Sequence, residues 1–230
     1  MCGGGAGEQV ADAYGKLGEI IEKDKPLLYV PLAMDEKQHP YDTCLQWIRN
    51  ELKSLELIDI EMVRSFDELA RKDCFGYSAI FIGGGNTYKL LKGIKDSGAF
   101  DKIRDYVLKN GVVFGGSAGA IIFGKDLDSC NIDDANEVGL EDNSGFDMIG
   151  GYSLLCHFTN RDEANTEINK KYLLKLSETK PVYALPEEDT IFIRDGRLEM
   201  IGSRPYYEFA GGEMRKKEIP PEHGGDKTRS

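Results

Sequence analysis

The sequence predicts an α/β protein with a mostly parallel sheet covered by helices on both faces. Short apolar runs rich in β-branched residues alternate with longer amphipathic stretches along the chain. Strands and helices that alternate in this way form parallel sheets buried on both sides. The chain has 230 residues, 40% of them hydrophobic and 30% charged, which is ample for one core. We therefore expect a single domain over residues 1–212.

The expected strands are short and apolar. They are residues 27–30, 58–63, 79–82, 112–114, 152–156 and 182–185, followed by a hairpin over residues 191–201 with an Asp-Gly turn. The expected helices carry apolar residues at three- and four-residue spacing. They are residues 42–55, 67–71, 87–91, 100–109 and 163–176. Strand and helix thus alternate over most of the chain.

Three segments fall outside this alternation. The opening Met-Cys-Gly-Gly-Gly runs directly into a polar helical stretch, so the first strand of the sheet is expected to be truncated, or the start to have been assigned late. Residues 125–150 are acidic and weakly patterned, as long functional or mobile loops are. Residues 213–230 are rich in charge, Pro and Gly and are expected to form a polar, disordered tail.

The composition argues against several classes of function. There are 29 Lys and Arg against 40 Asp and Glu, a net charge of −11, which disfavours nucleic-acid partners and anionic membranes. No apolar run approaches the ~20 residues that cross a bilayer. The five cysteines are scattered without a C-x-x-C pair, so we expect reduced thiols, no metal site and a cytoplasmic location. A homodimer is compatible with a chain of this kind, although no residue pattern marks an interface.

A glycine-rich turn joins the strand at 79–82 to the next helix. Its sequence, Gly-Gly-Gly-Asn-Thr at 83–87, suits an anion bound at a helix N-terminus. It lacks both the third glycine of G-x-G-x-x-G and the Gly-Lys-Ser/Thr ending of a P-loop. The turn is compatible with a site of backbone N–H donors or with a purely structural role, and a nucleotide site is the weaker alternative.

The most informative motif is Gly-Gly-Ser-Ala-Gly at 115–119. An apolar strand runs into Gly-x-Ser-x-Gly and small apolar residues follow, as in the strand-turn-helix of a nucleophile elbow. Such a turn pushes the hydroxyl of Ser117 outward, and Gly115 and Gly119 relieve the crowding beside it. The N–H of Ala118 would then face the oxyanion of an acyl transfer. A glycine-rich turn with an incidental serine is the alternative.

A serine nucleophile needs a general base, and the chain has three histidines. His39 lies in a polar loop and His223 in the expected tail. His157 follows an apolar strand at its C-terminal end, where ligands gather in open α/β sheets, so elimination favours His157. Cys156 is a competing nucleophile, but neighbours in a strand point to opposite faces, which makes a pair with His157 difficult.

The base in turn needs a carboxylate that fixes its tautomer and stabilises its charged form. Three candidates follow the strand at 182–185, again at its C-terminal end: Glu187, Glu188 and Asp189. The spacing alone does not choose among them.

Four motifs occur in order along the chain. They are Phe-Ile-Gly-Gly-Gly-Asn-Thr at 81–87, Gly-Gly-Ser-Ala-Gly at 115–119, His-Phe-Thr-Asn at 157–160 and Leu-Pro-Glu at 185–187. With this set, residues 27–209 resemble the dipeptidase E (alpha-aspartyl dipeptidase) and cyanophycinase group of serine peptidases. The resemblance implies a three-layer α/β sandwich of the class I glutamine-amidotransferase type. It also implies a serine peptidase that hydrolyses short peptides through an acyl-enzyme, without a metal or cofactor.

Specific site residues follow from the resemblance. It implies Ser117 as nucleophile, His157 as base and Glu187 as acid, and the backbone N–H groups of Gly85 and Ala118 as the oxyanion hole. The matching motifs and their flank suggest four substrate contacts: Asn86, Thr159, Asn160 and Arg161.

The chain departs from the aspartyl dipeptidases at one point. Those enzymes carry an arginine in the helix after the His-Phe-Thr-Asn motif, where it meets the substrate's aspartate. Residues 163–171 hold no arginine, and Arg161, Lys170 and Lys171 are the candidates to replace it. A lysine does not bind a carboxylate bidentately, so the resemblance leaves aspartyl specificity open.

Three other functions are weighed against the peptidase. A cyanophycinase-like isopeptide hydrolase shares the same triad, and only a substrate test separates the two. A non-catalytic small-molecule binding module would use the turn at 83–87 as an anion cradle. A glutamine amidotransferase is less compatible, because those enzymes usually carry cysteine at the elbow where this chain has Ser117.

Overall fold

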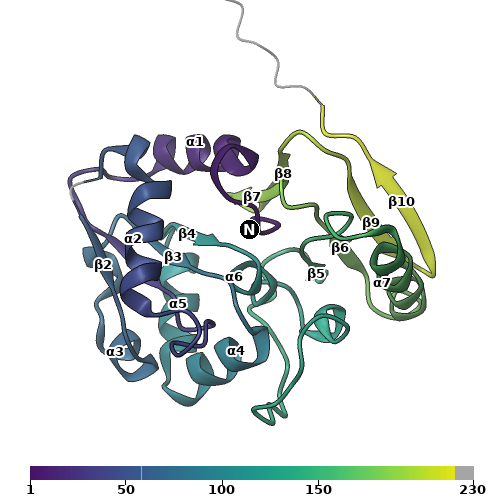
Figure 1. Ribbon diagram of the computed structural model, residues 1–230, viewed down its shortest axis with the longest axis horizontal. Coiled ribbons are helices and arrows are strands. Elements are labelled where there is room, and N and C mark those ends of the chain that lie inside the picture. The colour runs from purple at the N-terminus through teal and green to yellow at the C-terminus, as the bar shows by residue number, and fades with distance from the viewer. Residues whose placement is uncertain (58, 221–230) are drawn as a thin grey trace, which may run out of the picture.

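The computed structural model describes residues 1–57 and 59–220, in which two four-stranded sheets and a two-stranded hairpin lie side by side (Figure 1). The strands are β1 (Leu27–Val30), β2 (Ile60–Met62), β3 (Ala79–Ile82), β4 (Val113–Gly115), β5 (Ser153–Leu155), β6 (Val182–Ala184), β7 (Thr190–Arg194), β8 (Arg197–Ile201), β9 (Tyr206–Ala210) and β10 (Glu213–Lys217). The α-helices are α1 (Ala11–Ile20), α2 (Tyr41–Glu51), α3 (Phe66–Arg71), α4 (Thr87–Asp96), α5 (Ala99–Leu108), α6 (Ala118–Ile121) and α7 (Glu163–Leu176). Four 3₁₀ turns complete the set: η1 (Gly7–Val10), η2 (Lys53–Leu55), η3 (Cys74–Gly76) and η4 (Asp128–Cys130).

The first sheet is parallel, as predicted, with the strand order β2-β1-β3-β4. In register, Leu27 of β1 pairs with Ile60 of β2 and Ala79 of β3, and Phe81 of β3 pairs with Phe114 of β4. Every residue of β1 and β3 is buried, which explains why both strands appear in the sequence as continuous apolar runs. The strand expected at 58–63 is β2, and residue 58 lies outside the described residues.

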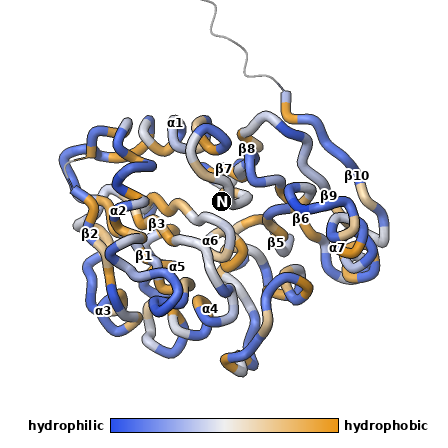
Figure 2. Tube along the Cα trace, in the orientation of Figure 1, coloured by the Kyte–Doolittle hydropathy of each residue, from blue (hydrophilic) through white to orange (hydrophobic). Residues whose placement is uncertain are grey.

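Alternate side chains of this sheet contact different helices. Leu27 and Tyr29 pack with buried residues of α1 and α2, whereas Leu28 and Val30 pack with those of α3, α4, α5 and α6. Because successive residues of a strand point to opposite faces, the helices form two outer layers around the sheet. Figure 2 shows β3 and α6 in hydrophobic colours and the outer helix α3 as largely hydrophilic. The three-layer α/β sandwich is therefore confirmed.

The N-terminal residues lie between the two sheets, where Figure 1 marks the N-terminus. Cys2 forms isolated bridges, parallel to Gly116 and antiparallel to Thr190. Its N–H donates to the Gly115 carbonyl at 2.8 Å, and its own carbonyl accepts the N–H of Ser117 at 3.2 Å. The segment thus takes the place of the first strand but pairs over very few residues. This pairing puts it directly beside the elbow.

The second sheet has the order β10-β9-β6-β5, and it corrects the expected tail. Residues 213–217 form β10, which pairs antiparallel with β9 through Met214 and Phe209. An edge strand keeps one side in water, so its polar residues look like those of a tail. The rest of the expected tail from residue 221, with His223, lies outside the described residues. The single domain stays a prediction.

The acidic stretch at 125–150 is irregular, as expected, but it is anchored in the core. Leu127, Cys130, Phe146 and Ile149 are all buried, and the Phe146 ring stacks on Phe123 and Phe100 with centroid distances of 4.8 and 4.2 Å. These apolar anchors hold the acidic side chains between them in place. In the described part of the chain, no helix combines the length and apolar character of a membrane span.

Candidate active site

Ser117 lies on the sharp turn between β4 and α6. Its φ of 51° and ψ of −116° are unusual for a residue other than glycine, and such strain tends to occur at functional positions. The flanking glycines allow the backbone to approach itself closely. A Cβ atom added at Gly115 would lie 2.2 Å from the Gly119 carbonyl oxygen, and one added at Gly119 would lie 2.1 Å from that of Ile82. The crowding expected from the motif is therefore present.

Two hydrogen bonds connect three of the predicted residues. Ser117 Oγ lies 2.8 Å from His157 Nε2, and His157 Nδ1 lies 2.8 Å from Glu187 Oε1. His157 follows β5 and Glu187 follows β6, and these two strands are parallel neighbours. Their C-terminal ends therefore share one edge of the sheet, where open α/β sheets gather ligands. The structure thus brings Glu187, of the three carboxylates that the sequence left open, to the histidine.

The contact with Glu187 favours one tautomer of the imidazole. A carboxylate beside Nδ1 favours the tautomer with the proton on that nitrogen, which leaves a lone pair on Nε2 facing the serine hydroxyl. The side chains of His157 and Glu187 are each 27% exposed. They are partly shielded from water and still accessible from the surface, as a general base that acts on a substrate must be.

The competing nucleophile, Cys156, is buried at 1% exposure. Burial raises the pKa of its thiol well above the usual range, so the thiol stays protonated at neutral pH and is a poor nucleophile. Its Sγ lies 3.7 Å from the carbonyl oxygens of both Cys2 and Ser117. Cys156 is therefore a packing residue behind the turn.

The turn at 83–87 lies against the serine. A Cβ atom added at Gly84 would lie 3.2 Å from Ser117 Cβ, and Gly85 has a φ of +132°, which glycine adopts readily. The turn ends at the N-terminus of α4, where the Thr87 N–H donates to Asp134 Oδ2 at 2.8 Å. The anion position expected at this helix start is thus filled by the chain's own carboxylate. The assignment of Gly85 and Ala118 to an oxyanion hole stays a prediction.

A cavity of about 160 Å³ opens beside the serine. Its lining includes Gly85, Ser117 and His157, the apolar Ile121 and Leu155, and the charged Asp133, Asp134 and Arg161. A larger cavity of about 640 Å³ lies between α1 and the β7–β8 hairpin, without any of the predicted catalytic residues in its lining. Across residues 1–57 and 59–220, no group of three His, Cys, Asp or Glu side chains is arranged to hold a metal ion.

A family model for Peptidase family S51 matches residues 1–201. The chain belongs to this family. It is 31% identical over 141 residues to Peptidase E of Salmonella arizonae, covering 58% of this chain and 59% of that protein. It is 30% identical over 152 residues to Peptidase E of Escherichia coli, covering 63% of each chain. The matches thus span about six tenths of the length of these relatives.

Two solved structures share the fold of this S51 member. One is a candidate peptidase E protein from Listeria monocytogenes, with a TM-score of 0.69 and 21% identity over 86% of this chain and 96% of that one. The other is a peptidase from an acI-B1 actinobacterium, with a TM-score of 0.62 and 17% identity over 95% and 93% of the two chains. At these identities the likeness concerns the fold.

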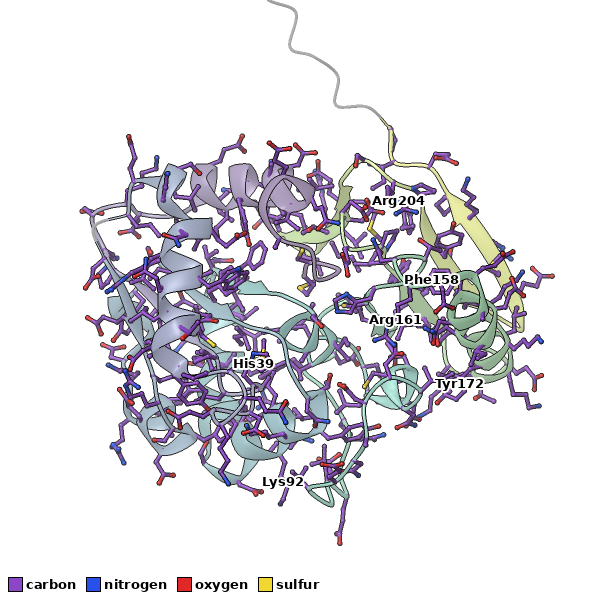
Figure 3. The ribbon with its side chains drawn as sticks, in the orientation of Figure 1. His39, Lys92, Phe158, Arg161, Tyr172 and Arg204 are labelled. Atoms are coloured by element: carbon purple, nitrogen blue, oxygen red, sulfur yellow. The ribbon has the colours of Figure 1, made fainter. Side chains whose placement is uncertain are left out.

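The four residues suggested as substrate contacts in this S51 chain differ in their hydrogen bonds and in their position relative to the cavity. The side chain of Asn86 caps α4 by accepting the Lys89 N–H at 2.8 Å, and it donates to the Ala135 carbonyl at 2.9 Å. Within the described residues, Arg161 alone of the four lines the cavity. Figure 3 shows Arg161 on the side of the second sheet that faces the first, Phe158 over the second sheet, and His39 on the side of the first sheet.

Thr159 and Asn160 belong to a network behind the histidine. Asn160 accepts the Glu187 N–H at 2.8 Å and donates to Glu188 at 3.0 Å, while Arg204 donates to both Glu188 and Thr159 at 3.3 Å. Burial raises the pKa of Glu188, but the hydrogen bonds from Asn160 and Arg204 outweigh burial and hold it below its usual value. These contacts join the loop that carries the histidine to the loop that carries Glu187.

Several contributors had no recognisable sequence signal. Arg204 lies in a turn before β9, and Gln9 donates to Glu187 Oε2 at 3.4 Å from the other end of the chain. The carbonyl of Gly3 accepts the His157 N–H at 3.0 Å. Asp133 and Asp134 did carry a signal, because they follow the elbow in an acidic stretch, but the pattern did not single them out.

Asp189 provides a test by pH. It is fully buried, its Oδ1 accepts the Arg204 N–H at 3.1 Å, and its Oδ2 has no partner among the described residues. Burial raises its pKa to about 7, above the ~3.9 of an unfolded aspartate. The folded chain therefore holds this proton more tightly, and wild type loses stability as the pH rises from ~4 to ~7.

Asp189→Asn removes this titration. Relative to wild type, we expect the variant to have a larger free energy of unfolding, and so a greater stability, at pH 8 than at pH 5. Urea unfolding at the two pH values measures both proteins. An equal difference at pH 5 and pH 8 would mean that Asp189 titrates normally in the folded chain.

Proposed function

We propose that this chain is a serine peptidase that hydrolyses short peptides through an acyl-enzyme. The observation that carries the proposal is the line of hydrogen bonds from Ser117 through His157 to Glu187, which starts at a strained elbow. Membership of family S51 supports the reaction class, and the buried, protonated thiol of Cys156 favours serine over cysteine as nucleophile. The five free cysteines favour a reducing, cytoplasmic location.

In the proposed mechanism, His157 Nε2 takes the proton of Ser117 as the serine oxygen attacks the peptide carbonyl. Glu187 holds the proton on Nδ1 and stabilises the imidazolium that forms. The N–H groups of Gly85 and Ala118 stabilise the oxyanion, by about 3 to 4 kcal/mol for each donor. The imidazolium then protonates the leaving amine, and His157 activates the water that releases the acyl group.

The size of the cavity supports short substrates. Sites for drug-sized ligands measure ~300 to 1,000 Å³, whereas this one measures about 160 Å³. A volume of this size suits one end of a peptide better than the middle of a long chain. Aspartyl preference is not part of the proposal, because the guanidinium of Arg161 is paired with Asp133 at 2.7 Å. The homodimer stays a prediction.

Two measurements on the wild-type protein test this function. An alkyl fluorophosphonate, which reacts with activated serines, should form a single adduct that peptide mapping assigns to Ser117. Mass spectrometry of a library from two to six residues long should show faster cleavage of di- and tripeptides than of hexapeptides, and pre-treatment with the phosphonate should prevent it. An adduct elsewhere, or an unchanged library, would overturn the proposal. Cleavage confined to β-aspartyl-arginine would point to the cyanophycinase-like alternative.

A further inference from the structure

The cavity beside Ser117 contains three charged side chains besides the histidine: the carboxylates of Asp133 and Asp134 and the guanidinium of Arg161. Its two cysteines, Cys130 and Cys156, are buried, and burial raises the pKa of both thiols, so that they are neutral. The charge that a substrate meets here is therefore set by two carboxylates and one cation.

The cation is already paired. Arg161 Nη1 lies 2.7 Å from Asp133 Oδ1, and the side chain of Asp133 is 14% exposed while that of Arg161 is 46% exposed. The backbone of Asp133 is held in turn, because its N–H donates to the carbonyl of the buried Cys130 at 2.9 Å. An arginine that forms an ion pair with a fixed carboxylate attracts an acidic substrate less than an unpaired arginine does, because the pair as a whole is close to neutral.

The second carboxylate keeps part of its charge. Asp134 accepts the N–H and the hydroxyl of Thr87 at the start of α4. The N-terminus of a helix offsets about half of a negative charge. The Asp133–Arg161 pair is close to neutral, so the cavity as a whole is negative.

We propose that Asp133 determines the charge of the substrates that this chain accepts. By occupying Arg161, it makes the cavity favour a cationic nitrogen near the scissile bond and disfavour a carboxylate. That nitrogen is either the α-ammonium of the first residue or a basic side chain. The inference rests on the proposed function, because it concerns the selectivity of the same site.

Dipeptides whose first residue is basic, neutral or acidic separate these sources. The set is Lys-Leu, Leu-Leu and Asp-Leu, each with a free and an acetylated amino terminus. For wild type we expect kcat/KM to fall at least tenfold on acetylation of Leu-Leu if the α-ammonium is recognised, and Lys-Leu to exceed Leu-Leu if the side chain is. Asp-Leu should be the poorest of the free dipeptides. A wild type that cleaves Asp-Leu fastest would contradict the inference.

Asp133→Asn tests the role of the carboxylate itself. The substitution frees Arg161, so kcat/KM for Asp-Leu relative to Leu-Leu should rise about tenfold. Asp142→Asn is the matched control, because Asp142 lies in the same acidic stretch, is 68% exposed and pairs with Lys95. The control should leave the ratio unchanged. An unchanged ratio in Asp133→Asn would overturn the inference.

Two further measurements cover the cases in which hydrolysis or folding fails. Arg161→Gln leaves Asp133 unpaired. In this variant kcat/KM for Asp-Leu relative to Leu-Leu should fall, and kcat/KM for Lys-Leu relative to Leu-Leu should rise. Calorimetric binding of the same dipeptides to Ser117→Ala, with and without Asp133→Asn, reports the preference without turnover. If wild type cleaves none of the dipeptides but binding shows the expected charge preference, the proposed function fails and the inference stands. If the measured affinities do not depend on the charge of the dipeptide, the inference is wrong and the proposed function is unaffected.

Discussion

Ser117→Ala is expected to lower kcat for peptide hydrolysis by about 10⁵- to 10⁶-fold, because the loss of a serine nucleophile removes the covalent route entirely. The variant lacks one oxygen atom, and the hydrogen bonds that hold the turn use backbone atoms of residues 115–121. Circular dichroism and the melting temperature should therefore stay close to those of wild type. Progress curves at high enzyme concentration measure the residual rate.

His39→Ala is the matched control for this experiment. It removes a histidine from an exposed loop that contributes nothing to the cavity, so hydrolysis should continue at the wild-type rate. Residual activity of Ser117→Ala within tenfold of wild type would mean that another group attacks the peptide, and the assignment of the nucleophile would be wrong.

Glu187→Gln is expected to lower kcat by about 10⁴-fold, with a smaller change in KM. The glutamine can turn its amide so that an N–H faces Nδ1 of His157, which places the imidazole proton on Nε2, towards the serine. In that tautomer the histidine cannot accept the serine proton. Steady-state kinetics on the best peptide of the library measure both constants.

Glu188→Gln provides the comparison within the same run of carboxylates. Glu188 reaches the predicted catalytic residues through Asn160 and Arg204, without a contact to the imidazole. Its loss should therefore reduce kcat less than tenfold. A larger loss of kcat for Glu188→Gln than for Glu187→Gln would mean that the assignment of Glu187 as the acid is wrong.

Much of the fold could be predicted because its patterns are local. The buried runs that became β1 and β3 need both faces covered, so their residues are apolar throughout. The helix expected at 163–176 has the same bounds as α7, in which the Asp162 side chain caps the first turn and Leu173 is buried. The elbow was also visible, because the constraints on Ser117 come from residues only two positions away.

Other features depended on contacts between distant parts of the chain. β10 looks like a tail because an edge strand needs few apolar residues, and its pairing with β9 determines its structure. The short N-terminal segment forms only isolated bridges, and they depend on Gly116 after β4 and Thr190 of β7, which lie far from it in the sequence.

The features of the candidate site also fall into two groups, those set by local sequence and those set by contacts between distant residues. The sequence by itself determined the sandwich, the elbow serine and, by elimination, the histidine, because each depends on a strand end or a spacing of a few residues. Only the tertiary structure decided that Glu187 meets His157, that Asp134 fills the start of α4 and that Asp133 holds Arg161. These contacts join residues 28 to 47 positions apart, and no local pattern encodes which loop ends will meet.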